Sequence, residues 1–262
     1  MRRITSGILL FIIAALLCYA PPSSTSQSAG TVLRLRVRVR IGEASPKGLS
    51  RKRFYLARGS LEQNKAMIET IAQRPVVSRD CYFRKAGASE ALIKWLKNND
   101  CESVYCREIQ TDDVEGAQAV PEFVNAIAAG EKELGSRELA RKWLTVNLPE
   151  KLRNGFYRER QNDLQTSLAQ GETSSGAKVL SVMTDRYGTA YFTDLQPGTY
   201  TLSNILPTEI GSNSLLWNCE VQVKQDDRGY EKPYVIANSR QDKTVKCVAI
   251  EKRLPVCATA VK

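Results

Sequence analysis

Apolar and basic residues alternate without interruption over residues 31–41, in the sequence TVLRLRVRVRI. Successive side chains of a β-strand point to opposite faces of its sheet, so this pattern predicts a strand with one buried face and one basic face. The apolar face comprises Leu33, Leu35, Val37, Val39 and Ile41. The basic face comprises Arg34, Arg36, Arg38 and Arg40. A shorter run over residues 52–57 predicts a second strand.

Helical periodicity replaces this alternation after the second strand. Apolar residues recur at spacings of three and four, which predicts five helices, over residues 61–72, 89–98, 121–128, 136–144 and 149–168. Ser89 and Ser136 are placed to cap two of these helices, and Pro121 suits a first helical turn. Residues 170–178 then predict a flexible linker, and strands resume from Val179 to Ile250.

The two N-terminal strands need partners from elsewhere in the chain, because two strands alone do not form a stable sheet. We therefore predict an α+β fold in which a helical insertion splits an antiparallel β-sandwich. Residues 30–58 and 177–262 would form the sandwich, and residues 59–176 the insertion. The two ends of the insertion must then lie close together. The alternative is two independent domains.

A family resemblance appears in residues 184–202, TDRYGTAYFTDLQPGTYTL, which indicate a turn, a strand, a second turn and a second strand. The spacing TD-x-x-G-x-x-x-F-x-x-L-x-P-G-x-Y-x-L resembles the core signature of the carboxypeptidase regulatory-like domain, a transthyretin-like sandwich. The matching residues are Thr184, Asp185, Gly188, Phe192, Leu195, Pro197, Gly198, Tyr200 and Leu202. The resemblance implies a module that accompanies enzymes, transporters and surface proteins and has no catalytic residues of its own.

The N-terminus has the features of a secretory signal. A basic start is followed by the apolar run Ile8–Ala20, which is too short to span a membrane comfortably, and then by a polar spacer. We assign residues 1–29 to signal peptide and spacer, with cleavage after Ala20 or near Ser28 or Ala29. An uncleaved anchor is the alternative. The chain is thus expected to be periplasmic or secreted, and not an integral membrane protein after cleavage.

Six cysteines follow the signal segment, and an even number in an oxidising compartment predicts a disulfide framework. They are Cys81, Cys101, Cys106, Cys219, Cys247 and Cys257. We expect Cys219 to pair with Cys247, because these two lie on consecutive strand-like runs. Cys81 would then pair with Cys101 or Cys106, and Cys257 with the remaining one.

The chain contains no histidine, which removes the commonest general base and the commonest zinc ligand. The cysteines also lack paired Cys-x-x-Cys motifs, so we expect no metal, no cofactor and no enzymatic activity. The alternative is a carboxylate-based hydrolase in the helical region. Its candidates are Glu90, Asp112, Asp113 and Glu122, whose spacing does not distinguish them from solvated surface residues.

The four arginines of the first strand allow two interpretations. Alternate residues of a strand repeat at about 6.6–6.8 Å, close to the charge spacing of a polyanion, and the net charge of +10 agrees. The favoured interpretation is instead a solvated face on which the arginines pair with Glu or Asp of adjacent strands, because no aromatic residues interleave them.

The function that these features favour is an exported, non-catalytic interaction or structural protein, whose sandwich presents the helical insertion to a protein or cell-envelope partner. Polyanion or envelope binding through the basic strand is the alternative, and no specific nucleic-acid recognition is expected. Trp95, Trp143 and Trp217 lie on apolar faces and are expected in the core, whereas Tyr187 at a turn tip could be exposed.

Overall fold

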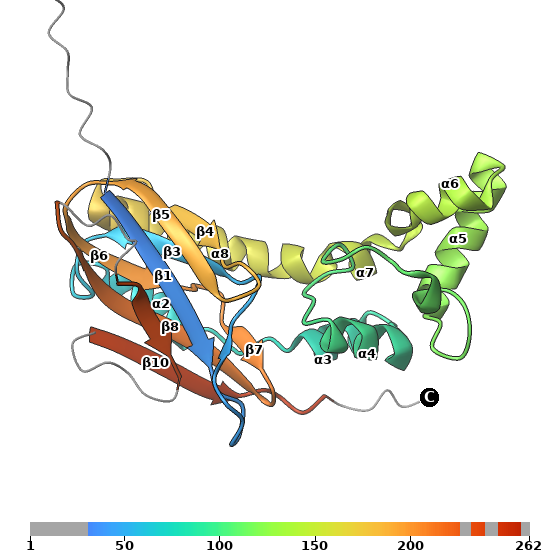
Figure 1. Cartoon of the computed structure of the whole chain (residues 1–262), viewed down its shortest axis with the longest axis horizontal. Helices are drawn as coiled ribbons and strands as arrows, with labels where there is room; N and C mark the ends of the chain where they lie inside the picture. The colour runs from blue at the N-terminus through green and yellow to red at the C-terminus, as the bar shows by residue number, and fades with distance from the viewer. Residues whose placement is uncertain (1–30, 226–231, 239–245, 258–262) are drawn as a thin grey trace, which may run out of the picture. The chain divides into compact units, whose positions relative to one another are not determined.

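Two β-sheets and a set of helices form an α+β structure (Figure 1). The computed structural model describes residues 31–225, 232–238 and 246–257, and the predicted signal segment lies outside these ranges. In the first sheet, which we call sheet A, the central strand is the one whose apolar and basic residues alternate. Its strands are β1 (Thr31–Val39), β2 (Lys47–Gly48), β5 (Thr189–Leu195) and β9 (Tyr234–Ala237). β2 and β5 pair antiparallel to β1, whereas β9 pairs parallel to it.

The second sheet, sheet B, is antiparallel throughout. Its strand order is β10-β8-β6-β3-β4, and the short strand β7 also pairs with β8. The strands are β3 (Arg53–Arg58), β4 (Leu180–Met183), β6 (Gly198–Ser203), β7 (Thr208–Ile210), β8 (Asn213–Val223) and β10 (Lys246–Arg253). Leu56 of β3 pairs with Leu180 of β4, so the helical segment leaves and re-enters the strands at neighbouring points, as predicted.

The apolar faces of the two sheets form one core. Leu35 and Val37 of β1 are fully buried there, together with Phe192 of β5, Leu202 of β6 and Trp217 of β8. This confirms that the first two strands pair and pack with strands from the C-terminal part. The alternation of β1 thus has its expected result, because an apolar side chain at every second position can be buried only on one face.

The helices occupy most of the chain between β3 and β4. They are α2 (Lys65–Gln73), α3 (Arg79–Lys85), α4 (Glu90–Asn98), η1 (Thr111–Asp113), α5 (Pro121–Leu134), α6 (Arg137–Lys142), η2 (Leu144–Asn147), α7 (Glu150–Arg153) and α8 (Gly155–Ser175). Ser89 and Ser136 cap α4 and α6 as predicted, each accepting a backbone N–H bond. Helix α3, capped by Ser78, was not predicted.

Helix α8 corrects the predicted linker at residues 170–178, because it continues to Ser175 and ends at Gly176 with φ +61°. Its extension packs on sheet B, where Gly171 lies against Met67 of α2 and Val179. The absence of a side chain at Gly171 allows this close approach. A polar composition with several small residues resembles a linker in sequence, whereas here the small residues serve helix–sheet packing.

The helices contribute to two apolar clusters. α2 and the C-terminal part of α8 cover sheet B, where Met67, Ile71 and Leu164 pack with strand residues (Figure 1). The remaining helices form a separate core, which includes Phe123 of α5 and Phe156 at the start of α8. Helix α8 therefore belongs to both clusters and joins the helical segment to the strands. In the described part of the chain, no helix is long and apolar enough to cross a membrane.

The described part of the chain contains three disulfides, and one of them has the expected pairing. Cys219 of β8 lies opposite Cys247 of β10, and the two are bonded as predicted. The expected pairing of Cys81 with Cys101 or Cys106 was wrong. Cys101 pairs with Cys106.

Cys81 of α3 instead pairs with Cys257, at a Cα–Cα distance of 5.0 Å. The Cys101–Cys106 bond follows from the local path of the chain, whereas the Cys81–Cys257 bond follows from the tertiary structure. The loop after α4 turns back on itself, which leaves Cys101 and Cys106 with Cα atoms 5.5 Å apart. The segment after β10 reaches α3, so it is still linked to the helical region, as expected.

Candidate functional site

The basic face of β1 is on the outside of sheet A. Leu35 and Val37 point into the core, so the side chains between them point away from it. Arg34 and Arg36 are half-buried on this outer side, and Arg38 is exposed. Arg40 follows the end of the strand. We call these four residues, Arg34, Arg36, Arg38 and Arg40, the arginine face.

The neighbours of Arg34 and Arg36 on the adjacent strands are uncharged. Arg34 lies opposite Tyr191 of β5, whose side chain is 45% exposed. Arg36 lies between Thr189 of β5 and Val235 of β9. The Nε atoms of both arginines are buried and have no acceptor. A buried donor without a partner costs about 1–3 kcal/mol, so each guanidinium retains unmet hydrogen-bonding capacity.

Arg38 and Arg40 also have no acidic neighbour among the residues that the structure describes. Arg38 lies beside Gly48 of β2, which has no side chain, and its Nη2 is 3.5 Å from the Pro46 carbonyl oxygen. Asn238 holds the backbone of Arg40 in place: it accepts from the Arg40 N–H at 2.8 Å and donates to the Arg40 carbonyl at 2.9 Å. These contacts fix the path of the chain, and no carboxylate in residues 31–225, 232–238 or 246–257 pairs with the Arg40 guanidinium.

The cross-strand ion pairs of the favoured interpretation are not formed with the described residues of β2, β5 and β9, although Arg38 and Arg40 are exposed as that interpretation expects. Among the residues that the structure describes, none of the four arginines forms an ion pair. The reason is that β5, β2 and β9 present Thr, Tyr, Gly and Val beside them, a partner set that sequence alone did not determine. Tyr187, expected at a turn tip, is 60% exposed, with the Arg186 guanidinium 4.6 Å from its ring centre.

A second group of charges lies where the helical segment meets the strands. The Nζ atom of Lys52, beside the start of β3, is 3.2 Å from Asp100 Oδ1 and 3.5 Å from Glu102 Oε1. Arg160 of α8 reaches the other Glu102 oxygen at 3.6 Å. Lys52 is only 5% exposed, so its charge needs these carboxylates. Burial alone would raise the pKa of Glu102, but the charges of Lys52 and Arg160 outweigh it and lower that pKa.

The same group continues through Arg79 at the start of α3. Its Nη1 donates to the Cys101 carbonyl at 3.0 Å, and both its backbone N–H and its guanidinium contact the Glu209 carboxylate of β7. Burial raises the pKa of Glu209 despite this contact. These residues line a cavity of about 10 Å³, which has room for about one water molecule. We interpret these ion pairs as structural contacts that hold the helical segment to the strands. The cavity between them is too small to hold a substrate.

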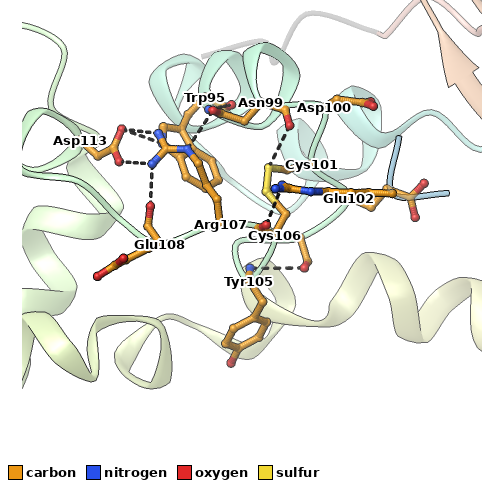
Figure 2. The surroundings of a disulfide bond; sticks show 12 residues. Trp95, Asn99, Asp100, Cys101, Glu102, Tyr105, Cys106, Arg107, Glu108 and Asp113 are labelled. Atoms are coloured by element: carbon orange, nitrogen blue, oxygen red, sulfur yellow. Dashed lines mark hydrogen bonds and ion pairs between the residues drawn. A yellow bond between two sulfur atoms is a disulfide. The ribbon is translucent and has the colours of Figure 1, made fainter. Parts of the chain in front are cut away.

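A third polar group stabilises the helical segment beside the Cys101–Cys106 disulfide (Figure 2). Asp113 accepts from Trp95 Nε1 at 2.8 Å and from both Nη atoms of Arg107 at 2.8 Å. Burial would raise the pKa of Asp113, but these bonds and the Gln110 N–H lower it. The Arg107 guanidinium also lies 4.7 Å from the Trp95 ring centre. Asp113 thus has a structural partner for each of its oxygens.

The structure does not bring together the four carboxylates considered for a hydrolase. Glu90 pairs with Arg84 at 2.8 Å, Glu122 accepts from the Ser89 hydroxyl at 2.7 Å, and Asp112 is exposed. Asp113 is bound to Arg107, so the three carboxylates other than Asp112 each have a structural partner. Within the described ranges, no group of three or more Cys, Asp or Glu side chains is arranged to hold a metal ion.

The tryptophans depart from expectation at one position. Trp95 and Trp217 are buried as predicted, but Trp143 is 56% exposed. It caps the C-terminus of α6, where the chain changes to η2 and the helical periodicity ends. Leu139 and Val146 are exposed near it in the sequence. Nothing in the local sequence distinguishes this tryptophan from a buried one.

Comparisons with known proteins assign no family. No protein-family profile and no curated protein matches the chain. Among solved structures, the pilus backbone protein RrgB of Streptococcus pneumoniae is similar, with 10% identity and a TM-score of 0.25. The similarity covers 80% of this chain and 41% of that protein. At this TM-score it supports no conclusion about fold or function, and the resemblance to the carboxypeptidase regulatory-like domain stays a prediction.

Proposed function

We propose that the protein is an exported, non-catalytic binding or structural protein that binds a polyanion through the arginine face. The observation that carries this proposal is the row of four arginines, three on β1 and Arg40 just after it, that the described residues leave without any acidic partner. A row of unpaired cations on a rigid central strand is costly to the isolated protein, because like charges repel and two buried Nε donors are unmet. An anionic ligand removes the repulsion between these charges.

Three further observations support the proposal. The net charge of +10 attracts polyanions at long range. Three disulfides are typical of proteins outside the reducing cytoplasm, which agrees with a signal peptide at residues 1–29. A sandwich split by a helical insertion, in the manner of a transthyretin-like domain, would supply a non-catalytic scaffold that holds β1 in a fixed conformation.

The test is retention of the purified protein on immobilised heparin over a salt gradient. We expect wild-type protein to elute at higher salt than the double variant Arg36→Glu/Arg38→Glu. The charge-matched control is Lys94→Glu/Lys142→Glu, which changes two exposed lysines of the helical segment and should elute near wild type. Equal elution of the two double variants would show that net charge alone is responsible and would contradict a site on β1.

A second candidate function is suggested by the exposed apolar residues of the helical segment. Leu139, Trp143 and Val146 are each about half-exposed around the α6–η2 junction, at 46%, 56% and 52%. Exposed apolar side chains of this kind are typical of protein contact surfaces. The segment could thus bind a protein or envelope partner. Crosslinking in envelope extracts tests this: a partner captured by wild type and by Ala169→Ser, but not by Trp143→Ala, would support it.

A further inference from the structure

The spacing of the arginine face restricts the polymer that it can bind. Arg34, Arg36 and Arg38 are successive alternate residues of β1, and Arg40 follows two residues later, just beyond the end of the strand. Six backbone bonds separate the Cα atoms of each neighbouring pair. A β-strand advances about 3.3–3.4 Å for every three such bonds, so arginines two residues apart on the strand repeat at about 6.6–6.8 Å. A polymer with six single bonds between its charges advances by nearly the same distance when it is extended. Such a polymer can place one charge beside each arginine in register.

Phosphodiesters joined through three carbon atoms meet this condition. The path from one phosphorus to the next crosses P–O, O–C, C–C, C–C, C–O and O–P bonds. Inorganic polyphosphate has a much shorter path between charges, so most of its charges would lie between the arginines. Polyuronates carry their carboxylates on rigid rings, whose spacing is set by the ring and not by a six-bond chain. The register of β1 therefore favours a phosphodiester polymer.

The chemistry of the arginines agrees with this choice. A guanidinium binds phosphate through two parallel N–H donors, a geometry that lysine cannot reproduce. Neighbouring side chains half-bury Arg34 and Arg36 and cover their Nε atoms, so the stems have lost part of their freedom before any ligand binds. The exposed side chain of Arg38 retains an accessible guanidinium.

The residues beside the arginines indicate a polymer without bases. Single-stranded nucleic acids also have six bonds between phosphates, but binding without sequence preference relies on aromatic side chains that stack successive bases. Tyr191 lies beside Arg34 and supplies one such ring. The residues beside Arg36 are Thr189 and Val235, which cannot stack a base.

We propose that the arginine face binds an extended poly(polyol phosphate) chain, with one phosphodiester per arginine along four repeats. This inference rests on the proposed polyanion function and names its ligand class. The shortest ligand that uses the whole face has four phosphates. Chains of more than four phosphates gain little affinity, because they add only alternative positions along the same four arginines. Shorter chains lose about one arginine–phosphate contact for each missing phosphate.

The experiment measures the affinity of the full-length secreted protein for fluorescent poly(glycerol phosphate) oligomers of two to eight phosphates. Comparators are polyphosphate, oligo(dT) and oligogalacturonate of equal total charge. We expect poly(glycerol phosphate) to bind at least tenfold more tightly than each comparator, with affinity rising steeply up to four phosphates. The slope of log K against log salt should be about −2.8, at about 0.7 for each of four phosphates on a single-stranded chain.

Variants separate the outcomes. Arg36→Gln should weaken binding about tenfold and reduce the salt slope by about 0.7, while Lys94→Gln should change neither. Thermal melting of each variant checks that it is folded. Equal affinity for all anions at equal charge would overturn the spacing argument but leave polyanion binding intact. Tighter binding of oligo(dT) would make the ligand a nucleic acid and overturn the base-free polymer. No binding to any polyanion would overturn the proposed function as well.

Discussion

The substitution Val37→Asp tests whether the two ends of the chain share one core. Val37 is fully buried between the two sheets, on a strand that pairs with β5 and β9. Its core neighbours include Phe192 and Trp217, from the C-terminal part of the chain. A carboxylate at this position should therefore destabilise strands at both ends of the sequence together.

Three contributions determine how much Val37→Asp lowers the free energy of unfolding. Losing the buried valine costs about 1.5–3 kcal/mol. Burying a neutral carboxyl group without a partner adds about 1–3 kcal/mol. Keeping that group protonated at pH 7, about three units above its ordinary pKa, adds about 4 kcal/mol. The sum of about 7 kcal/mol or more approaches the whole stability of a typical domain, about 5–15 kcal/mol.

Hydrogen exchange measured by mass spectrometry, with urea denaturation, provides the assay. Peptides from β1, β5 and β8 should lose protection together in Val37→Asp. The matched control is Arg38→Asp, one residue along and on the exposed side of the sheet, where a change within about 0.5 kcal/mol is expected. The destabilisation should also decrease by about 4 kcal/mol between pH 7 and pH 4, because the buried carboxyl is then protonated without cost.

One result would refute the shared core. If β8 peptides in Val37→Asp kept wild-type protection while β1 peptides exchanged freely, the C-terminal strands would be stable without β1. The chain would then consist of independent parts, as in the alternative with two separate domains.

Three further predictions concern the helical segment and its links to the strands. Asp113→Asn should lower the free energy of unfolding by about 1.5–3 kcal/mol at pH 7, measured by urea denaturation, because it removes the charge bound to Arg107. Since the pKa of Asp113 is lowered in the folded state, this difference should shrink as pH falls below the ordinary value of 3.8. Cys81→Ser with Cys257→Ser should cost about 2–5 kcal/mol and expose the C-terminal segment to proteolysis. Gly171→Val should cost about 1–3 kcal/mol in melting experiments, since even a Cβ there would lie 2.9 Å from Met67 Sδ.

Each of these three has a neighbouring control. Asp112→Asn alters an exposed carboxylate and should leave the free energy of unfolding and its pH dependence unchanged. If it destabilised the protein as much as Asp113→Asn, the hydrogen bonds of Asp113 would not explain the effect. Cys101→Ser with Cys106→Ser opens a shorter loop and should cost less than opening the Cys81–Cys257 loop. Ala169→Val lies on the exposed side of α8, and a cost equal to that of Gly171→Val would exclude the packing explanation.

Local patterns in the sequence were sufficient to predict most of the elements. The alternation over residues 31–41 predicts β1 and its two faces as far as Val39, because successive side chains of a strand point to opposite faces. The strand ends there, and Ile41 is exposed. Ser89 and Ser136 predict two helix starts, because a cap bonds within its own turn. Cys219 and Cys247 could be paired because both lie on strand-like runs, and β8 and β10 do lie side by side, although β9 comes between them in the chain and joins sheet A.

The partners of the arginines were decided by the tertiary structure. The sequence of a strand determines which of its residues share a face, but it does not determine which other strands pair with it. The parallel pairing of β9 with β1, and the antiparallel pairing of β5, place Val235, Thr189 and Tyr191 beside Arg34 and Arg36. Whether this row of charges is neutralised or free depends on those long-range pairings, so the candidate site was visible in sequence only as a possibility.

The same physical reason explains the other differences. Cys81 and Cys257 are 176 residues apart, and their bond depends on where the segment after β10 ends relative to α3. Trp143 is exposed together with Leu139 of α6, because the packing of that helix buries the side that carries Ala140. The sequence by itself determined the directions of side chains within each element and several of the starts and stops. Only the tertiary structure decided which elements meet, because contacts between distant residues depend on the packing of the whole chain.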